Sequence, residues 1–244
     1  MKTVLRFGSR VFRLPLVGAP LHRSWFWVRR RVLALVTPFI MARYLRTHSP
    51  AKLQLGSGPA VSLLLGWLNT DLMPERWPTA RLDATRRFPF SDGTFACVFS
   101  EHMIEHIPLT AGRHLLTESF RVLAPGGVIR IATPDLARII RLFAAEDETA
   151  RSYLRWSAAH YRLGSDLPVA PIVINDLFHD HGHQFLYDEA TLSAALSAAG
   201  FRDIVRRAPR ESAYPELRGL EVHMHVIGEE ANNYETLVLE ARRP

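Results

Sequence analysis

From residue 52 onward, short apolar runs alternate with longer segments in which apolar residues recur at helical spacing. The helical segments cover residues 109–123, 136–145, 149–162 and 189–199. Such alternation is typical of a mostly parallel sheet whose strands are joined by crossover helices. We therefore predict a doubly wound α/β fold with a seven-stranded, mostly parallel sheet and helices on both faces. Its strands are expected at residues 52–55, 67–71, 80–83, 96–100, 128–133, 201–207 and 235–241.

The first 48 residues follow a different pattern. They contain ten Lys or Arg residues and no acid, so the net charge of +6 belongs to this segment and the rest of the chain is mildly acidic. We divide the chain into a basic N-terminal helical arm, residues 1–48, and a single domain, residues 49–244. Within the arm we expect two helical pieces, residues 25–36 and 38–46, separated at Pro38.

The arm has two interpretations. Aromatic residues at positions 25–27 stand beside arginines at positions 29–31, a combination typical of a segment that lies on an anionic membrane face. Alternatively, the aromatic residues pack on the domain. The longest apolar stretch, residues 32–42, is about half of the ~20 residues that cross a bilayer. Nucleic acid is a disfavoured partner, because no RNA-binding module is visible and the domain is mildly acidic.

Composition places the domain among globular proteins. Hydrophobic residues make up 48% and charged residues 22% of the chain, which is enough for a substantial core. The single cysteine, Cys97, cannot form an internal disulfide, which favours a reducing compartment. No apolar segment of the secretory type follows the first residues. We expect a cytoplasmic protein, attached peripherally to the inner membrane face if the arm binds lipid.

A glycine-rich turn and two acids stand at the ends of the first three predicted strands. Gly56-Ser57-Gly58 ends the first strand, Asp71 the second and Asp83 the third. Ligands of open α/β sheets bind outside the carboxyl ends of the strands, and glycines let a ligand approach the backbone. The first carboxylate can accept hydrogen bonds from ribose hydroxyls and the second from an adenine amine. The ordered set therefore predicts a nucleoside-binding site.

Six motifs in this order resemble a class I S-adenosylmethionine-dependent methyltransferase of the methyltransferase type 11 kind. The resemblance covers about residues 51–207 and implies a Rossmann-like fold with S-adenosylmethionine as the cofactor. More narrowly, the chain is similar to bacterial members linked with surface polysaccharide pathways. The motifs are residues 53–58 (LQLGSG), 66–71 (GWLNTD), 82–84 (LDA), 88–95 (FPFSDGTF), 100–106 (SEHMIEH) and 121–127 (RVLAPGG).

The resemblance also implies roles for individual residues: the glycine turn faces the methionine part and the ribose, and the residues after the fourth strand line the floor near the acceptor. Two positions depart from the family pattern, since Gln54 stands where an acid is usual and Ala60 where a third glycine is usual. Only residues 59–66 connect the first two strands, so the first helix is expected to be short or missing. The implied cofactor-binding residues are Gln54, Leu55, Gly56, Ser57, Gly58, Asp71, Leu72, Asp83, Ala84, Ser100 and Glu101.

Histidines supply the candidate catalytic groups. A hydroxyl acceptor usually needs a general base, and histidine suits this role near neutral pH. We choose His102 first, with His106 and His183 behind it; His183 lies in a segment, about residues 135–187, that is expected to form an acceptor cap. Residues 102–106 also match the H-x-x-E-H pattern of zinc proteases, which we disfavour because of their place after the fourth strand.

A metal site is an open alternative to these catalytic roles. His179, His181 and His183, together with His223 and His225 on an alternating stretch, are possible ligands. Histidines in loops are more often solvated or hydrogen-bonded, so we predict no metal.

The sequence thus predicts methyl transfer from S-adenosylmethionine to a small-molecule or glycan-type acceptor, with a hydroxyl as the expected acceptor group. One alternative is a catalytically inactive, cofactor-binding partner subunit. A second is an RNA methyltransferase, which would bind RNA through the arm in a salt-sensitive manner.

Overall fold

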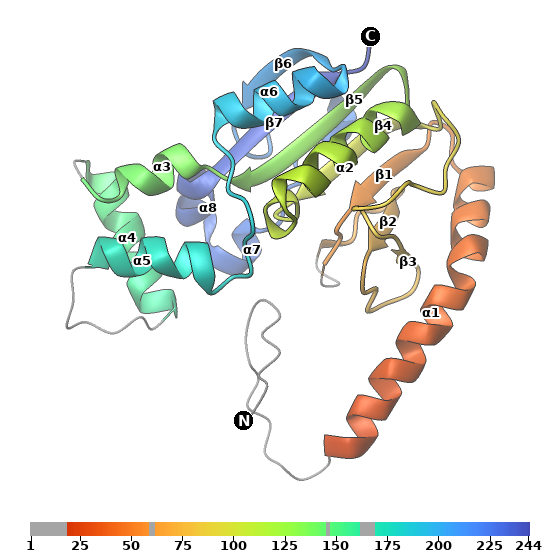
Figure 1. The fold of residues 1–244 in the computed structure, drawn as a ribbon, viewed down its shortest axis with the longest axis horizontal. Coiled ribbons are helices and arrows are strands. Elements are labelled where there is room, and N and C mark those ends of the chain that lie inside the picture. Colours follow the sequence, from red (N-terminus) through yellow and green to blue (C-terminus); the bar gives the residue numbers. More distant parts are fainter. Residues whose placement is uncertain (1–18, 59–61, 145–146, 162–168) are drawn as a thin grey trace.

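The computed structural model describes residues 19–58, 62–144, 147–161 and 169–244, with residues 19–30 and Ala34 described by their backbone alone. Its centre is a seven-stranded sheet in the order β3-β2-β1-β4-β5-β7-β6 (Figure 1). All strands run parallel except β7, which is antiparallel to both of its neighbours. The strands are β1 Lys52–Leu55, β2 Leu68–Asp71, β3 Ala80–Arg81, β4 Phe95–Glu101, β5 Leu123–Pro134, β6 Arg202–Arg207 and β7 Thr236–Arg242.

The predicted doubly wound, seven-stranded fold is confirmed. The strand order reverses between β1 and β4, and the crevice outside the carboxyl ends of strands at such a reversal is where open α/β sheets bind ligands. The helical elements are α1 Ala19–Thr47, η2 Ile104–His106, α2 Leu109–Val122, α3 Leu136–Arg141, α4 Glu148–Tyr161, α5 Val169–His179, α6 Glu189–Ala199, η3 Pro215–Leu217, α7 Met224–Ile227 and α8 Glu229–Glu235.

Successive side chains along a strand point to opposite faces of the sheet, and the two faces pack against different elements. Val98 and Ile129 belong to the largest core cluster, which includes residues of α2 and α6; these helices lie together over one face in Figure 1. Phe99 and Val128, one residue away on the same strands, pack on the other side against Leu217 of η3. The second face is therefore covered here by a short 3₁₀ turn.

A further cluster lies beyond the end of β5. It joins α3, α4, α5 and α8 through buried residues that include Ile139, Tyr153, Val173 and Tyr234. The sequence pattern predicted no helix between residues 162 and 189, whereas the structure has α5 there. Val173 and Leu177 are buried on one side of this helix, and Pro171 lies in its first turn, where a missing N–H breaks no helical hydrogen bond.

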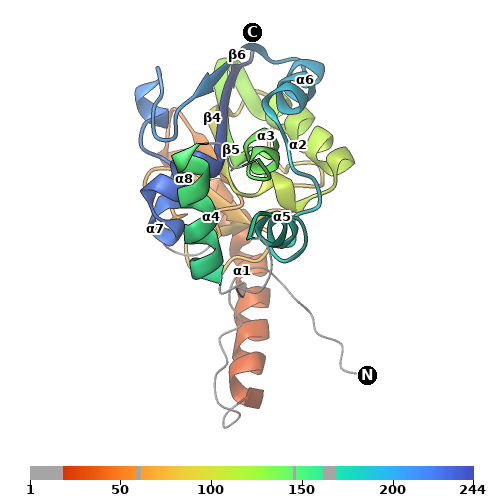
Figure 2. The same cartoon turned by 90° about the vertical axis from the view of Figure 1, so that its left-hand side faces the viewer.

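The predicted break in the arm at Pro38 is also wrong, because α1 is one continuous helix from Ala19 to Thr47. Ile40, Met41 and Tyr44 are buried in the main core, and the Tyr44 hydroxyl donates to Lys52 O at 2.9 Å. This packing offsets the helix hydrogen bond that proline cannot make. In two views the N-terminal half of α1 extends away from the rest of the chain (Figures 1 and 2).

Candidate functional site

The turn after β1 is held by the protein itself. Gly56 and Gly58 have φ angles of +65° and +57°, a region that favours glycine. Ser57 N donates to Thr70 O at 2.9 Å. A Cβ on Gly56 would lie 2.3 Å from the Met103 Cγ, whereas one on Gly58 would meet nothing within 4 Å. Gly56 is therefore required by the packing of Met103, and only Gly58 leaves open space for a ligand.

A cavity of about 290 Å³ lies at the reversal of strand order. Its volume is close to the lower end of the roughly 300–1,000 Å³ typical of ligand pockets. It brings together eight of the predicted site residues: Gln54, Gly56, Ser57, Gly58, Glu101, His102, His106 and His183. The sequence interpretation did not include Ser62, Glu105, Pro134, Tyr161, Leu177, Val226 and Glu235 in the site, nor His181 and His223 except as possible metal ligands.

The other predicted residues do not line this cavity. Leu55 and Ser100 are buried within their strands, and Leu72 is 48% exposed. The Asp71 carboxylate accepts from Gly58 N at 2.9 Å and from Met73 N at 2.7 Å, so it braces the glycine turn. Further along the sheet edge, beyond β3, are the two remaining residues, Asp83 and Ala84.

Asp83 is already engaged within its own loop. Its carboxylate accepts from Thr85 Oγ1 at 2.6 Å and from Arg86 Nε at 3.1 Å. Burial raises the pKa of Asp83, but these hydrogen bonds outweigh it and hold that pKa below its usual value. The roles of Asp71 and Asp83 toward a nucleoside stay predictions.

Two buried polar atoms suit the cofactor that the sequence resemblance implies. Gln54 Nε2 donates to Ser62 O at 2.8 Å, while Gln54 Oε1 is buried without a hydrogen-bond partner among the described residues. Ser57 Oγ is likewise buried and unpartnered in the described part of the chain. Buried polar groups normally have partners, so both atoms, which belong to residues lining the cavity, fit the ammonium and carboxylate of a methionine moiety. Ala60 and most of its turn lie outside the described residues.

His102 is held among carboxylates. Its Nδ1 lies 3.3 Å from Glu105 Oε1, and its ring lies 3.9 Å, centroid to centroid, from that of His223. Burial lowers the pKa of His102, but Glu105, with Glu235 and Glu101 nearby, outweighs it and raises the pKa to about 9. The carboxylates around the ring thus favour positive charge at this position. The role of His102 as the general base stays a prediction.

His183 has the opposite character. Its Nδ1 donates to Leu177 O at 2.6 Å, which leaves Nε2 as a proton acceptor. Burial lowers the pKa of His183 to about 4, although Glu105 acts against it, so the ring is neutral at pH 7. His106 lies beside it, with 4.9 Å between the ring centroids. Gln184 fixes the pair by donating from Nε2 to His106 O at 2.7 Å.

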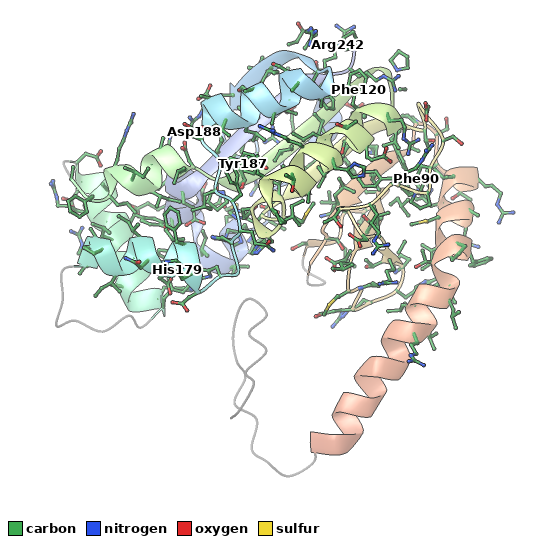
Figure 3. The ribbon with its side chains drawn as sticks, in the orientation of Figure 1. Phe90, Phe120, His179, Tyr187, Asp188 and Arg242 are labelled. Carbon is green, nitrogen blue, oxygen red and sulfur yellow. The ribbon has the colours of Figure 1, made fainter. Side chains whose placement is uncertain are left out.

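The remaining predicted histidines do not gather as a metal cluster. His179 is exposed at the end of α5 (Figure 3), and His181 Nε2 donates to Asp176 Oδ2 at 2.9 Å. His223 and His225 do not lie on a strand, because α7 begins between them. His225 is exposed, whereas His223 lines the cavity.

Glu101 reaches the cavity but is engaged by backbone. Its carboxylate accepts from Val222 N at 3.0 Å and from His223 N at 2.9 Å. It therefore holds the segment that carries His223.

Of the cavity residues that were not predicted from the sequence, Glu105 lies inside the motif at 100–106 and could have been found there. Glu235 follows more than 100 residues later, and only the position of β7 beside β5 brings it in.

A family described as a methyltransferase domain matches residues 42–205. No curated protein matches the chain. Among solved structures, an S-adenosylmethionine-dependent methyltransferase of Thermotoga maritima, described as a possible histamine N-methyltransferase, is 15% identical over 92% of this chain and 95% of its own, with a TM-score of 0.45.

Two other solved structures are similar at the same level. The phosphoethanolamine N-methyltransferase 2 of Haemonchus contortus, in complex with S-adenosyl-L-methionine, is 15% identical over 85% of this chain and 52% of its own, with a TM-score of 0.47. A methyltransferase of Archaeoglobus fulgidus is 16% identical over 91% of this chain and 98% of its own, with a TM-score of 0.47. With the family match covering most of its length, the chain belongs to the methyltransferase domain family and is an S-adenosylmethionine-dependent methyltransferase.

Proposed function

We propose that this enzyme methylates a hydroxyl group of a small molecule or glycan and that His183 is the base. The observation that carries the proposal is the hydrogen bond from His183 Nδ1 to Leu177 O, which makes Nε2 the proton-accepting nitrogen, in the same cavity as the glycine turn. When bound, S-adenosylmethionine supplies an already activated methyl group. A hydroxyl differs from an amine in needing a proton acceptor as it attacks, and His183 provides one.

The other residues of the cavity position the reactants. Gln54 Oε1 accepts a hydrogen bond from the amine of the methionine moiety, and Ser57 Oγ binds its carboxylate. His106 lies beside His183 and can accept from or donate to the same acceptor oxygen. Proximity and orientation of this kind supply up to roughly 7–11 kcal/mol of the barrier reduction in reactions between bound groups.

The acceptor is tested with the full chain and methyl-labelled S-adenosylmethionine. We expect a labelled methyl ether when the enzyme is incubated with a cell extract separated into small polar molecules and glycans, and the mass spectrum of the product identifies the linkage. A labelled N-methyl product would contradict the hydroxyl. Absence of both S-adenosylhomocysteine and labelled product from every fraction would favour the inactive partner subunit.

We also propose that the arm attaches the enzyme to an anionic membrane face. On the described part of α1, Leu35 is 80% and Phe39 55% exposed, one helical turn apart, and the exposed Arg31 lies one turn before Leu35. Apolar insertion combined with basic residues, each worth about 1 kcal/mol near anionic lipid, gives peripheral binding. None of the helices in the described ranges is both long and apolar enough to cross a bilayer.

Substituting the exposed apolar residues of α1 tests this attachment without opening the core. The full chain should co-sediment with vesicles of mixed anionic and neutral lipid at low salt, and less so at high salt because screening weakens the electrostatic part. The double variant Leu35→Asp and Phe39→Asp should lose most of the binding. Ile140→Asp, at a residue 58% exposed on α3, should keep it. If the unmodified chain stays in the supernatant at low salt, the membrane proposal fails.

A further inference from the structure

Three metal-ligating side chains from distant parts of the sequence meet at one side of the cavity. His102 follows β4, His223 precedes α7 and Glu235 ends α8. One ligand atom from each lies within 4.8 Å of the other two. Their side chains are 13%, 26% and 5% exposed, so the group is largely shielded from solvent.

We propose that His102, His223 and Glu235 bind a divalent transition-metal ion of the Zn²⁺ class. Two imidazoles and one carboxylate are a ligand set found in catalytic zinc sites, where a fourth position stays open to water or substrate. Zn–N and Zn–O distances are about 2.0–2.2 Å, so the three side chains need to close in by only about an ångström around the ion. All three residues line the cavity, which gives the open position access to an acceptor.

The surroundings of His102 have the form that metal-binding histidines require. Its Nδ1 faces the Glu105 carboxylate at 3.3 Å, and Glu105 Oε2 accepts in turn from Thr133 Oγ1 at 3.0 Å. Metal-ligating histidines almost always donate their other ring N–H to such a group, which fixes the ring and its tautomer. The remaining nitrogen, His102 Nε2, is buried without a hydrogen-bond partner among the described residues. A metal ion would supply the partner that this atom lacks.

The other two ligands are also oriented by neighbours. Tyr153 OH donates to Glu235 Oε2 at 2.5 Å, which leaves Oε1 on the side of His223. Glu101 holds the backbone of Val222 and His223, as described above. His102 itself has a φ of +44°, a conformation that is uncommon outside glycine and that persists where the surrounding structure enforces it. The group is therefore positioned from three sides.

A neighbouring group, formed by Glu105, His106 and His183, has a similar spacing. We favour the first group because Glu105 already forms an ion pair with His102 Nδ1 and accepts a hydrogen bond from Thr133 Oγ1. A role for the ion in binding the acceptor oxygen rests on the proposed function. Metal binding itself is measured without cofactor or acceptor, so the two can fail separately.

The test is calorimetric titration of Zn²⁺ into the tag-free full chain after chelator treatment. We expect one tightly bound ion per chain. His223→Ala should weaken binding by about 100-fold or more, since loss of even a supporting residue typically costs 10–100-fold. His225→Ala, two residues away and exposed, should bind as the parent does, and His183→Ala should also keep the affinity.

A milder variant distinguishes a loss of metal affinity from a loss of the fold. Tyr153→Phe removes only the hydroxyl that orients Glu235 and should weaken Zn²⁺ binding by about 10-fold with an unchanged circular dichroism spectrum. Absence of Zn²⁺ binding by the parent chain would overturn the proposal. It would also be overturned if His183→Ala abolished binding while His223→Ala did not, because the ion would then occupy the neighbouring group.

Discussion

Replacing His183 with alanine is expected to lower turnover by roughly 10²–10⁴-fold, the usual contribution of a general base. The substitution removes the neutral ring whose Nδ1 is fixed on Leu177 O and whose Nε2 accepts the proton of the acceptor hydroxyl. Affinity for S-adenosylhomocysteine should stay unchanged, because His183 acts on the acceptor. Steady-state kinetics with the identified acceptor gives the first quantity, and calorimetric titration gives the second.

His179→Ala is the matched control for this variant. It removes a histidine four residues earlier, at an exposed position at the end of α5 that is labelled in Figure 3. His179 is not among the residues that line the cavity. It should keep the turnover and the cofactor affinity of the parent enzyme. Full turnover in His183→Ala would instead mean that positioning alone, or an acceptor that is already acidic, accounts for catalysis.

Replacing Arg130 with methionine is expected to lower the free energy of unfolding by about 3–5 kcal/mol, the cost of leaving buried charges without their partner. Arg130 is fully buried on β5. Its Nε donates to Glu221 Oε1 at 2.5 Å, and its Nη1 donates to Glu240 Oε1 at 2.7 Å. Methionine fills similar space but compensates neither carboxylate. Urea unfolding followed by circular dichroism measures the difference.

Arg207→Met provides the comparison, because Arg207 is 31% exposed and binds Glu240 from the outer side at 3.1 Å. Its loss leaves Glu240 paired with Arg130 and should cost no more than about 1 kcal/mol, as for other exposed ion pairs. If the two variants unfolded at the same urea concentration, the buried Arg130 network would contribute no more to stability than the partly exposed Arg207 pair.

The sheet could be predicted from sequence because each strand is marked locally. Short apolar runs predicted all seven strands, and the glycines or acids that end the first three marked the ligand-binding edge of the sheet. The continuous helix through Pro38 could not be foreseen, because what stabilises it is the burial of Ile40 and Tyr44 against the distant domain core. The local sequence shows that proline destabilises a helix, but it does not show the tertiary contacts whose stabilisation outweighs that effect.

The site was only half predictable for a similar reason. His102 and His106 stand in a recognisable motif, but the motif does not show which side chains surround each ring. The carboxylate of Glu235, from the far end of the chain, helps to raise the pKa of His102. Two histidines four residues apart, alike in sequence, are therefore placed in different chemical surroundings. That distinction needs the antiparallel insertion of β7 beside β5, which no short motif encodes.

Gly56 and Met103 are in close contact, and this contact joins the glycine turn at one end of the cavity to the histidines at the other. Met103 lies directly against the glycine turn on one side, and its chain neighbours are His102 and the first residue of η2. A ligand that displaces the turn must also move Met103, and with it the backbone that carries the histidines. We therefore expect binding at the glycine turn to be coupled to binding near the histidines. Any such coupling is reciprocal: an acceptor strengthens or weakens cofactor binding by the same factor that the cofactor does to the acceptor.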